Sequence, residues 1–176
     1  MTKLVTERLR LREMEESDAA FMLESLNEPA FIRHVADRGV RTVAEAQTYL
    51  RERITSKYQS QAYGVWLVEL KETSEAIGIC GLIKRDTLED VDLGFSFLER
   101  FWGRGFAFEA AAAVVDYGWK VADLPRIIAI VSPRNTASIR LLQKLGLSFE
   151  RKIRLSTSEP ELELLALGRP RGVSAD

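Results

Sequence analysis

Two periods of hydrophobic and polar positions run through the chain, and they predict both strands and helices. Apolar residues at every second position, or short β-branched and aromatic runs, indicate strands, whereas apolar residues every three to four positions indicate helices. In chain order these patterns predict a strand over Lys3–Arg12, a helix over Ala19–Leu26, an irregular loop over Phe31–Arg41, a helix from Thr42 to about Ser60, strands over Tyr63–Leu70, Ala76–Lys84 and Val91–Phe97, a helix from Ala107 to about Val121, a strand over Arg126–Val131, a helix over Thr136–Leu145, and a closing antiparallel pair over Leu147–Leu155 and Leu162–Leu167.

Residues at the ends of these elements support the boundaries. Thr42 and Glu45 have the spacing of a capping box, and Ser17 or Asp18 can cap the first helix. Gly146 follows the last helix, where a C-terminal glycine is favoured. The glycines within the predicted strand 76–84 indicate close packing or a bulge.

The order of the elements predicts a single α+β domain. Strand 91–97, helix 107–121 and strand 126–131 form a unit that should be right-handed with parallel strands. The nearly all-apolar strand 126–131 is typical of a central position covered on both faces. We expect a mixed, mostly antiparallel sheet flanked by about four helices, in a domain over residues 1–168 followed by a frayed tail over residues 169–176.

Composition narrows the class of protein. The 176 residues carry a formal net charge of −1, which gives no support for a nucleic-acid or membrane partner. No apolar run approaches the roughly 20 residues needed to span a bilayer, and the N-terminus lacks the apolar region of a signal peptide. The single cysteine, Cys80, cannot form an internal disulfide or a cysteine-based metal site. We expect a cytoplasmic protein with no metal.

One segment has the composition of an anion-binding loop. Trp102-Gly103-Arg104-Gly105-Phe106-Ala107 lies between a predicted strand and a predicted helix. Two glycines and a small residue there expose backbone N–H groups at the positive end of a helix dipole, which favours a phosphate or pyrophosphate. A dinucleotide-binding domain is disfavoured, because the glycine spacing is not G-x-G-x-x-G and no acidic residue ends a following strand about 20 residues on.

Two motifs in a fixed order then carry a family resemblance. WGRGFAFEAA is followed, after one helix and one strand, by PRNTASIRLLQKLGL; TERLRLRE and GVWLVELKETSEAIGICGL precede them. Over Thr6 to roughly Ile153 the chain resembles the GNAT superfamily of acetyl-CoA-dependent N-acetyltransferases, and more narrowly the branch of the ribosomal-protein N-terminal acetyltransferases. The resemblance implies direct acetyl transfer from acetyl-CoA to a primary amine, either a protein N-terminus or a small molecule. It also implies that strands 91–97 and 126–131 splay apart to admit the pantetheine arm.

The resemblance also implies which residues bind coenzyme A. Backbone N–H groups of Arg104, Gly105, Phe106 and Ala107, with Gly103 nearby, would hold the pyrophosphate; Asn135 would contact the pantetheine arm, and Ser138 would lie near the thiol. Phe95 and Phe97 are expected in the core or in the cleft for the co-substrate. The chain departs from the family pattern at Trp102, where Gln or Arg is commoner, and at Leu142, where many members have a tyrosine.

Acetyl transfer requires a neutral amine and a protonated or stabilised thiolate. Asp92, on a strand of the cleft, is our candidate base; the alternatives are an exposed carboxylate or a pair with a nearby arginine. Glu109 is expected to serve the helix dipole instead. Without a tyrosine at Leu142, Ser138 is the candidate donor to the sulfur, unless it only caps or lines its helix. The sole histidine, His34, is either an acceptor contact or an exposed loop residue.

Two classes of function stay open at this point. The first is an N-acetyltransferase whose acceptor is selected by the loops 31–41 and 85–90 and by the tail. The second is a non-catalytic acyl-CoA sensor on the same fold, which the missing tyrosine makes conceivable. A homodimer is one expected state, because closed dimers are the commonest oligomers.

Overall fold

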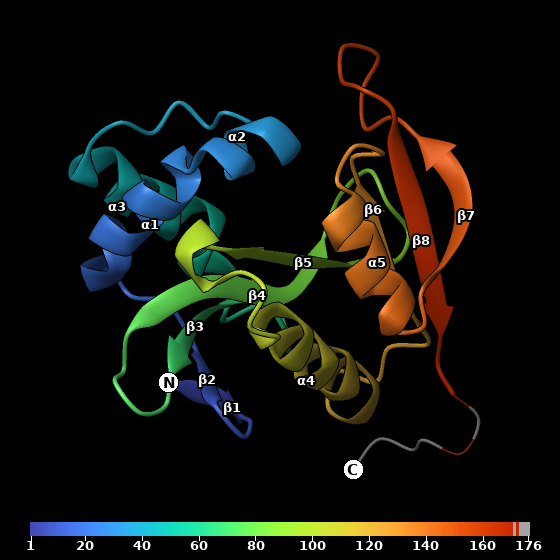
Figure 1. Ribbon diagram of the computed structural model, residues 1–176, viewed down its shortest axis with the longest axis horizontal. Helices are drawn as coiled ribbons and strands as arrows, with labels where there is room; N and C mark the ends of the chain where they lie inside the picture. Colours follow the sequence, from blue (N-terminus) through green and yellow to red (C-terminus); the bar gives the residue numbers. More distant parts are fainter. Residues whose placement is uncertain (171, 173–176) are drawn as a thin grey trace.

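The structure, a computed structural model, describes residues 1–170 and residue 172 (Figure 1). One eight-stranded sheet has the order β1-β2-β3-β4-β5-β6-β8-β7. Its strands are β1 (Thr2–Val5), β2 (Leu9–Arg12), β3 (Val65–Leu70), β4 (Ala76–Lys84), β5 (Val91–Phe97), β6 (Arg126–Val131), β7 (Ser148–Ile153) and β8 (Leu162–Gly168). The helices are α1 (Ala19–Asn27), α2 (Pro29–His34), α3 (Val43–Arg53), α4 (Phe106–Lys120) and α5 (Thr136–Lys144), with short 3-10 turns at Glu16–Asp18, Thr55–Lys57 and Glu99–Phe101.

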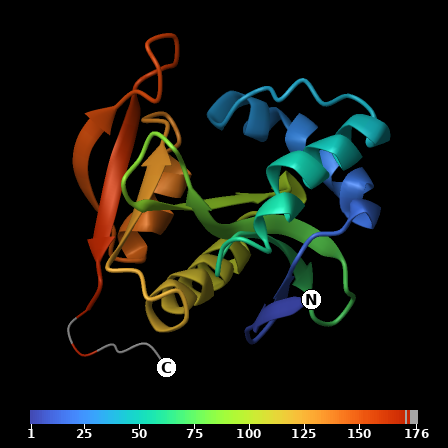
Figure 2. The same ribbon diagram turned by 180° about the vertical axis from the view of Figure 1, so that it is seen from behind.

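Helices cover both faces of the sheet (Figures 1 and 2). Successive residues of β3 point to opposite faces, as the pleat requires. Leu67 packs in a cluster with α1, α2 and α3, whereas Trp66 belongs to a larger cluster that includes α4 and α5. The Trp66 ring meets Tyr117 of α4 edge to face, with 5.0 Å between centroids. The sheet is therefore the middle layer of an α+β domain, as the sequence predicts.

β5 and β6 are parallel neighbours that separate after a short contact. Their ladder consists of the pairs Val91–Ile127 and Asp92–Ile128. Beyond Asp92, β5 stays paired with β4, and β6 stays paired with β8. The mixed sheet with a splayed parallel pair is thus confirmed, and the opening between the two strands begins at Asp92.

The predicted bounds of β4, β5 and β6 are confirmed residue for residue. Close packing at the β4 glycines is confirmed too. A Cβ added to Gly81 would lie 2.0 Å from the carbonyl oxygen of Gly64, and one added to Gly78 would lie 2.5 Å from the Phe97 ring. The positive φ of Gly146, +98°, matches its predicted place after α5.

The prediction of one strand over Lys3–Arg12 is wrong, because the segment folds into the antiparallel hairpin β1–β2. Thr6 makes the turn. Its N–H donates to the Leu9 carbonyl at 2.9 Å, and its Oγ1 accepts the Leu9 N–H at 3.1 Å. A threonine hydroxyl replaces a backbone bond in such a turn, and alternation of apolar residues looks the same in a hairpin as in one long strand.

Two helix predictions also need correction. The loop predicted over Phe31–Arg41 starts inside the helix α2, so the described residues form five helices where about four were predicted. Pro29 ends α1 and also begins α2, because the first helical position needs no N–H donor. The helix capped by Thr42 and Glu45 has the predicted capping box but ends at Arg53, not near Ser60.

The cap predicted for α1 is not formed. Asp18 precedes the helix, but no side-chain cap bond is made. Its carboxylate instead receives both terminal nitrogens of Arg12 at 2.8 Å. The same carboxylate also accepts the Glu15 N–H at 2.8 Å, so both of its oxygens are occupied before α1 begins.

Near the end of the described chain, Arg169 is held in place. Its N–H donates to the Pro125 carbonyl at 3.0 Å, and its guanidinium donates to the Trp119 carbonyl at 2.9 Å and to Asp123. Residues 171 and 173–176 of the predicted tail lie outside the described residues, so the boundary at residue 168 stays a prediction. No helix within the described ranges is long and apolar enough to cross a bilayer.

Candidate functional site

The loop between β5 and α4 presents a row of unused backbone donors. Gly103 and Gly105 have φ values of +72° and +81°, in the left-handed region that favours glycine. Within the described part of the chain, the N–H groups from Gly103 to Phe108 find no acceptor, and Glu109 is the first of the helix to donate, to Gly105 at 3.1 Å. Consecutive free N–H groups at a helix N-terminus form an anion-binding concavity.

Arg8 fastens this loop from the hairpin β1–β2. Its Nη1 donates to the Arg104 carbonyl at 2.9 Å, and its Nε donates to Glu109 at 2.7 Å. Thr6 adds a hydroxyl bond to Glu109 at 2.6 Å. Burial by itself would raise the pKa of Glu109, but the bonds from Thr6 and Arg8 outweigh it and leave the pKa below its ordinary value. Glu109 is therefore tied to Thr6 and Arg8, and Arg8 holds the loop although no local sequence pattern points to it.

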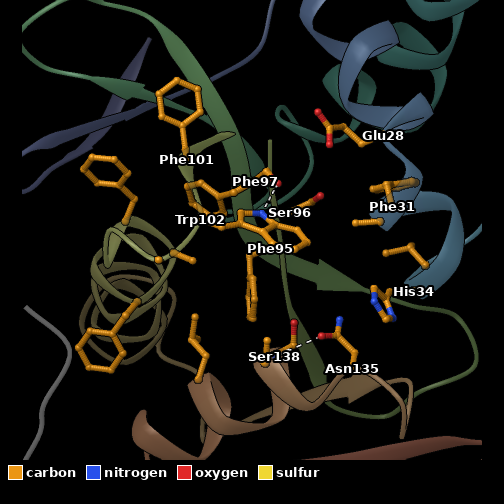
Figure 3. A pocket seen from close by; sticks show the side chains of 18 of the residues that line it. Glu28, Phe31, His34, Phe95, Ser96, Phe97, Phe101, Trp102, Asn135 and Ser138 are labelled. Atoms are coloured by element: carbon orange, nitrogen blue, oxygen red, sulfur yellow. Dashed lines mark hydrogen bonds between the residues drawn. The ribbon is translucent and has the colours of Figure 1, made fainter. Parts of the chain in front are cut away.

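A cavity of about 540 Å³ opens between the loop, the end of β5, α2 and the start of α5 (Figure 3). Eight of the nine predicted coenzyme A residues line it: Phe95, Phe97, Gly103, Gly105, Phe106, Ala107, Asn135 and Ser138. Arg104 does not line the cavity. Its carbonyl is used by Arg8, and its guanidinium lies 5.0 Å from the centroid of the Phe106 ring.

A second helix N-terminus faces the same cavity. Asn135 caps α5 by accepting the Ser138 N–H at 3.2 Å, and both side chains project toward the cavity in Figure 3. The Ser138 hydroxyl has no hydrogen-bond partner among the residues the structure describes. Arg134 and Thr136, for which the sequence predicts no role, also line this wall. Two positive helix ends directed at one cavity favour a polyanionic ligand.

A second cavity of about 610 Å³ adjoins the first on the side of α1, α2 and α3. The two share a boundary formed by Phe31, His34, Val35, Phe95, Ser96, Asn135 and Ser138. His34 faces Asn135 and Ser138 across this boundary in Figure 3, and its Nδ1 is buried without a hydrogen-bond partner among the described residues. Two ligands could therefore meet where β5 and β6 separate.

Asp92 lies at the apex of the splay and lines the second cavity, not the first. Its side chain is only 2% exposed, so the alternative of an exposed carboxylate is wrong. The Arg85 Nε donates to it at 2.6 Å, and the Ile130 N–H donates at 3.3 Å. Burial raises the pKa of Asp92 to about 6, although Arg85 acts in the opposite direction.

The site so described consists of two adjoining cavities on a splayed α+β sheet, with two helix N-termini directed at the first cavity. Comparison with known proteins identifies the family: residues 8–148 match the family model of the acetyltransferase (GNAT) domain. The chain belongs to this family and is an acetyl-CoA-dependent acyltransferase.

Relatives and solved structures agree with this assignment. The uncharacterized N-acetyltransferase p20 of Bacillus licheniformis is 34% identical over 155 residues, 88% of this chain and 86% of p20. An acetyltransferase structure from Agrobacterium tumefaciens has a TM-score of 0.80 and 25% identity, over 96% of this chain and 95% of that one.

Two further structures share the fold at lower identity. The ribosomal L7/L12 acetyltransferase RimL, in complex with coenzyme A, has a TM-score of 0.81 at 15% identity, over 96% of this chain and 98% of RimL. A spermidine N-acetyltransferase from Vibrio cholerae, in complex with coenzyme A and spermine, has a TM-score of 0.76 at 17% identity, over 93% and 96% of the two chains.

Proposed function

We propose that this protein transfers the acetyl group of acetyl-CoA directly to a primary amine that enters from the second cavity. One observation carries the proposal. A cavity with two helix N-termini meets a second cavity at Phe95, Ser96, Asn135 and Ser138, at the point where β5 and β6 separate. Direct transfer requires such an arrangement, because the amine and the thioester must be held together in one geometry.

The first cavity fits coenzyme A by its donors. The backbone N–H groups from Gly103 to Ala107, which include that of Arg104, are free to bind the pyrophosphate. Phe95 and Phe97 form an apolar wall beside the path of the pantetheine arm, and the exposed Arg134 adds a cation at the start of α5. The RimL and spermidine acetyltransferase structures, both solved with coenzyme A, have the same fold.

In the reaction, the amine nitrogen attacks the thioester carbonyl, the carbon–sulfur bond breaks, and the amine loses one proton. We assign that proton to Asp92, whose pKa of about 6 makes it a better base than an ordinary aspartate. Because Asp92 is buried, the proton would travel through water in the second cavity. Ser138, whose hydroxyl is otherwise unpaired, would donate to the departing sulfur, and His34 would contact the acceptor.

The alternative function, a sensor that binds acyl-CoA without turnover, rests on Leu142. This residue occupies the place of the family's tyrosine and is 2% exposed, so it offers the sulfur no proton. Release of free thiol from acetyl-CoA in the presence of an amine panel separates the two functions. We expect thiol release that depends on the amine, and a drop in kcat of about 10²-fold in Ser138→Ala.

Binding of acetyl-CoA without amine-dependent thiol release would support the sensor instead. An unchanged kcat in Ser138→Ala would remove Ser138 from the mechanism while leaving the acetyltransferase in place. A cytoplasmic location and a homodimer stay predictions for the protein in the cell.

A further inference from the structure

The second cavity carries more positive than negative side chains. Its lining contains five basic residues, Arg38, Arg53, Lys57, Lys84 and Arg85, and two carboxylates, Asp37 and Asp92. The basic residues come from both walls. Three lie at the ends of α2 and α3 or just after them, and two lie at the end of β4. The electrostatic potential in this cavity therefore favours a negatively charged ligand group.

Both carboxylates in the lining are already bound to arginines. Asp37 receives the Arg41 Nη2 at 2.6 Å, and the Arg41 guanidinium holds the pKa of Asp37 below its ordinary value. Asp92 receives the Arg85 Nε at 2.6 Å. The described lining thus offers a polycationic acceptor no carboxylate that lacks an arginine partner.

Three of the five cations, by contrast, have no carboxylate to neutralise them. Arg38 follows α2, Arg53 is the last residue of α3, and Lys57 lies in the 3-10 turn after it. None of the three forms an ion pair with any described residue, although Arg51 on the same helix pairs with Glu16. Lys84 differs, because its amino group binds the backbone carbonyl of Leu88 at 2.8 Å.

The rest of the lining sets the size and polarity of the ligand. Apolar side chains of Met22, Leu26, Phe31, Tyr49 and Ile54 line the α1–α3 side of the cavity. A volume of about 610 Å³ lies within the range of small-molecule sites, roughly 300–1,000 Å³. The lining therefore suits a small molecule with an anionic group near Arg38, Arg53 and Lys57 and an amine near the boundary with the first cavity.

We propose that the acceptor is a small primary amine that carries a carboxylate or phosphate group, which Arg38, Arg53 and Lys57 bind. This inference rests on the proposed function and names its acceptor class. It contrasts with the Vibrio cholerae structure of the same fold, which holds spermine. The three cations act on acceptor affinity and leave the binding of acetyl-CoA to the first cavity.

Matched amines test the inference through thiol release from acetyl-CoA. L-leucine is compared with L-leucinamide, phosphoethanolamine with ethanolamine, and spermine serves as the polycation. The amide carries the less basic amine, so a preference for leucine cannot arise from amine protonation. We expect kcat/KM to be at least about tenfold higher for the anionic member of one pair, because a charged group held by a guanidinium adds a strong hydrogen bond. The pair that responds identifies a carboxylate or a phosphate.

Variants then assign the effect to the cavity. In Arg53→Gln and Lys57→Gln we expect KM for the anionic amine to rise about tenfold, with the neutral amine unchanged. Arg51→Gln is the matched control, because Arg51 lies on the same helix outside the cavity lining. Equal effects of Arg51→Gln and Arg53→Gln would show that the overall positive charge of α3 is responsible, and would overturn the assignment to the cavity.

Different experimental results would overturn this acceptor class and the proposed acetyltransferase function. Turnover of spermine or of neutral amines at least as fast as of anionic amines would overturn the acceptor class and leave the acetyltransferase intact. Turnover of a peptide with acidic N-terminal residues, without turnover of small anionic amines, would also overturn it and indicate a protein acceptor. Absence of thiol release with every amine would remove the proposed function itself.

Discussion

Asp92 combines three constraints in one side chain. It closes the ladder between β5 and β6, it accepts the Ile130 N–H beyond that ladder, and it pairs with Arg85. Its burial raises its pKa to about 6, so the basic form disappears as the pH falls through that value. The same residue therefore holds the apex of the splay and titrates close to neutral pH.

If Asp92 accepts the amine proton, activity must follow its ionisation. We expect kcat of the wild type to fall as the pH drops through about 6, and Asp92→Asn to lower kcat by about 10²-fold and abolish this acid limb. Measurements of kcat against pH at saturating amine test both expectations. Arg85→Gln removes a group that lowers the Asp92 pKa, so its acid limb should move to higher pH. If Asp92→Asn kept the same acid limb as the wild type, another titrating group would be responsible for the fall in kcat.

Arg8 acts on the binding loop through the Arg104 carbonyl and Glu109. Lysine retains the charge but cannot make both bonds, because it lacks the planar fork of a guanidinium. We expect Arg8→Lys to raise KM for acetyl-CoA by about tenfold with little change in kcat. Initial rates at varied acetyl-CoA measure this, and Arg10→Lys on the same hairpin is the control. A lower kcat at unchanged KM would contradict a role in binding.

At the scale of elements, β3 and β4 approach each other closely at Gly81. The Gly64 carbonyl oxygen lies where the Cβ atom of a larger residue at position 81 would be. This oxygen accepts the Leu82 N–H at 3.0 Å. We expect Gly81→Ala to lower the free energy of unfolding by at least about 2 kcal/mol, because backbone cannot move aside as a flexible side chain can. Urea denaturation measures it.

Gly168→Ala in β8 is the matched control, because a Cβ there meets nothing within 4 Å. We expect it to change the free energy of unfolding by less than about 0.5 kcal/mol. Equal losses in the two variants would show that strand propensity, not the close approach, sets the cost.

At the scale of the whole molecule, the cavity proposed for acetyl-CoA is lined by elements that are far apart in the sequence. A ligand that binds only the folded state adds about 2.7 kcal/mol to the free energy of unfolding when its concentration is about 100 times Kd. For a chain of this size, that gain raises Tm by roughly 5–10 °C. We expect acetyl-CoA to produce a shift of this order in thermal denaturation. NAD, which also has a pyrophosphate, is the control and should give little shift. A larger shift with NAD would contradict the coenzyme A site.

Much of the fold was predictable because local patterns determine it. Strands β4, β5 and β6 have runs of β-branched and apolar residues bounded by polar turns, and their ends were predicted to the residue. The glycines of the binding loop were informative for the same reason, since a positive φ is a local requirement. The turn at Thr6 and the helix beginning at Pro29 were missed, because each residue type supports two local structures.

What the sequence by itself determined was the class of fold and the glycine conformations of the loop 102–107, because these depend on periodicity and on residues close together in the chain. Only the tertiary structure decided which distant residues complete the site. Arg8 reaches Glu109 across the sequence, Arg85 neutralises Asp92, and Arg53 and Lys57 come to face the same cavity as Ser138. Side-chain pairing and burial across elements leave no local pattern, so the charge of the second cavity emerges only when the sheet and helices pack together.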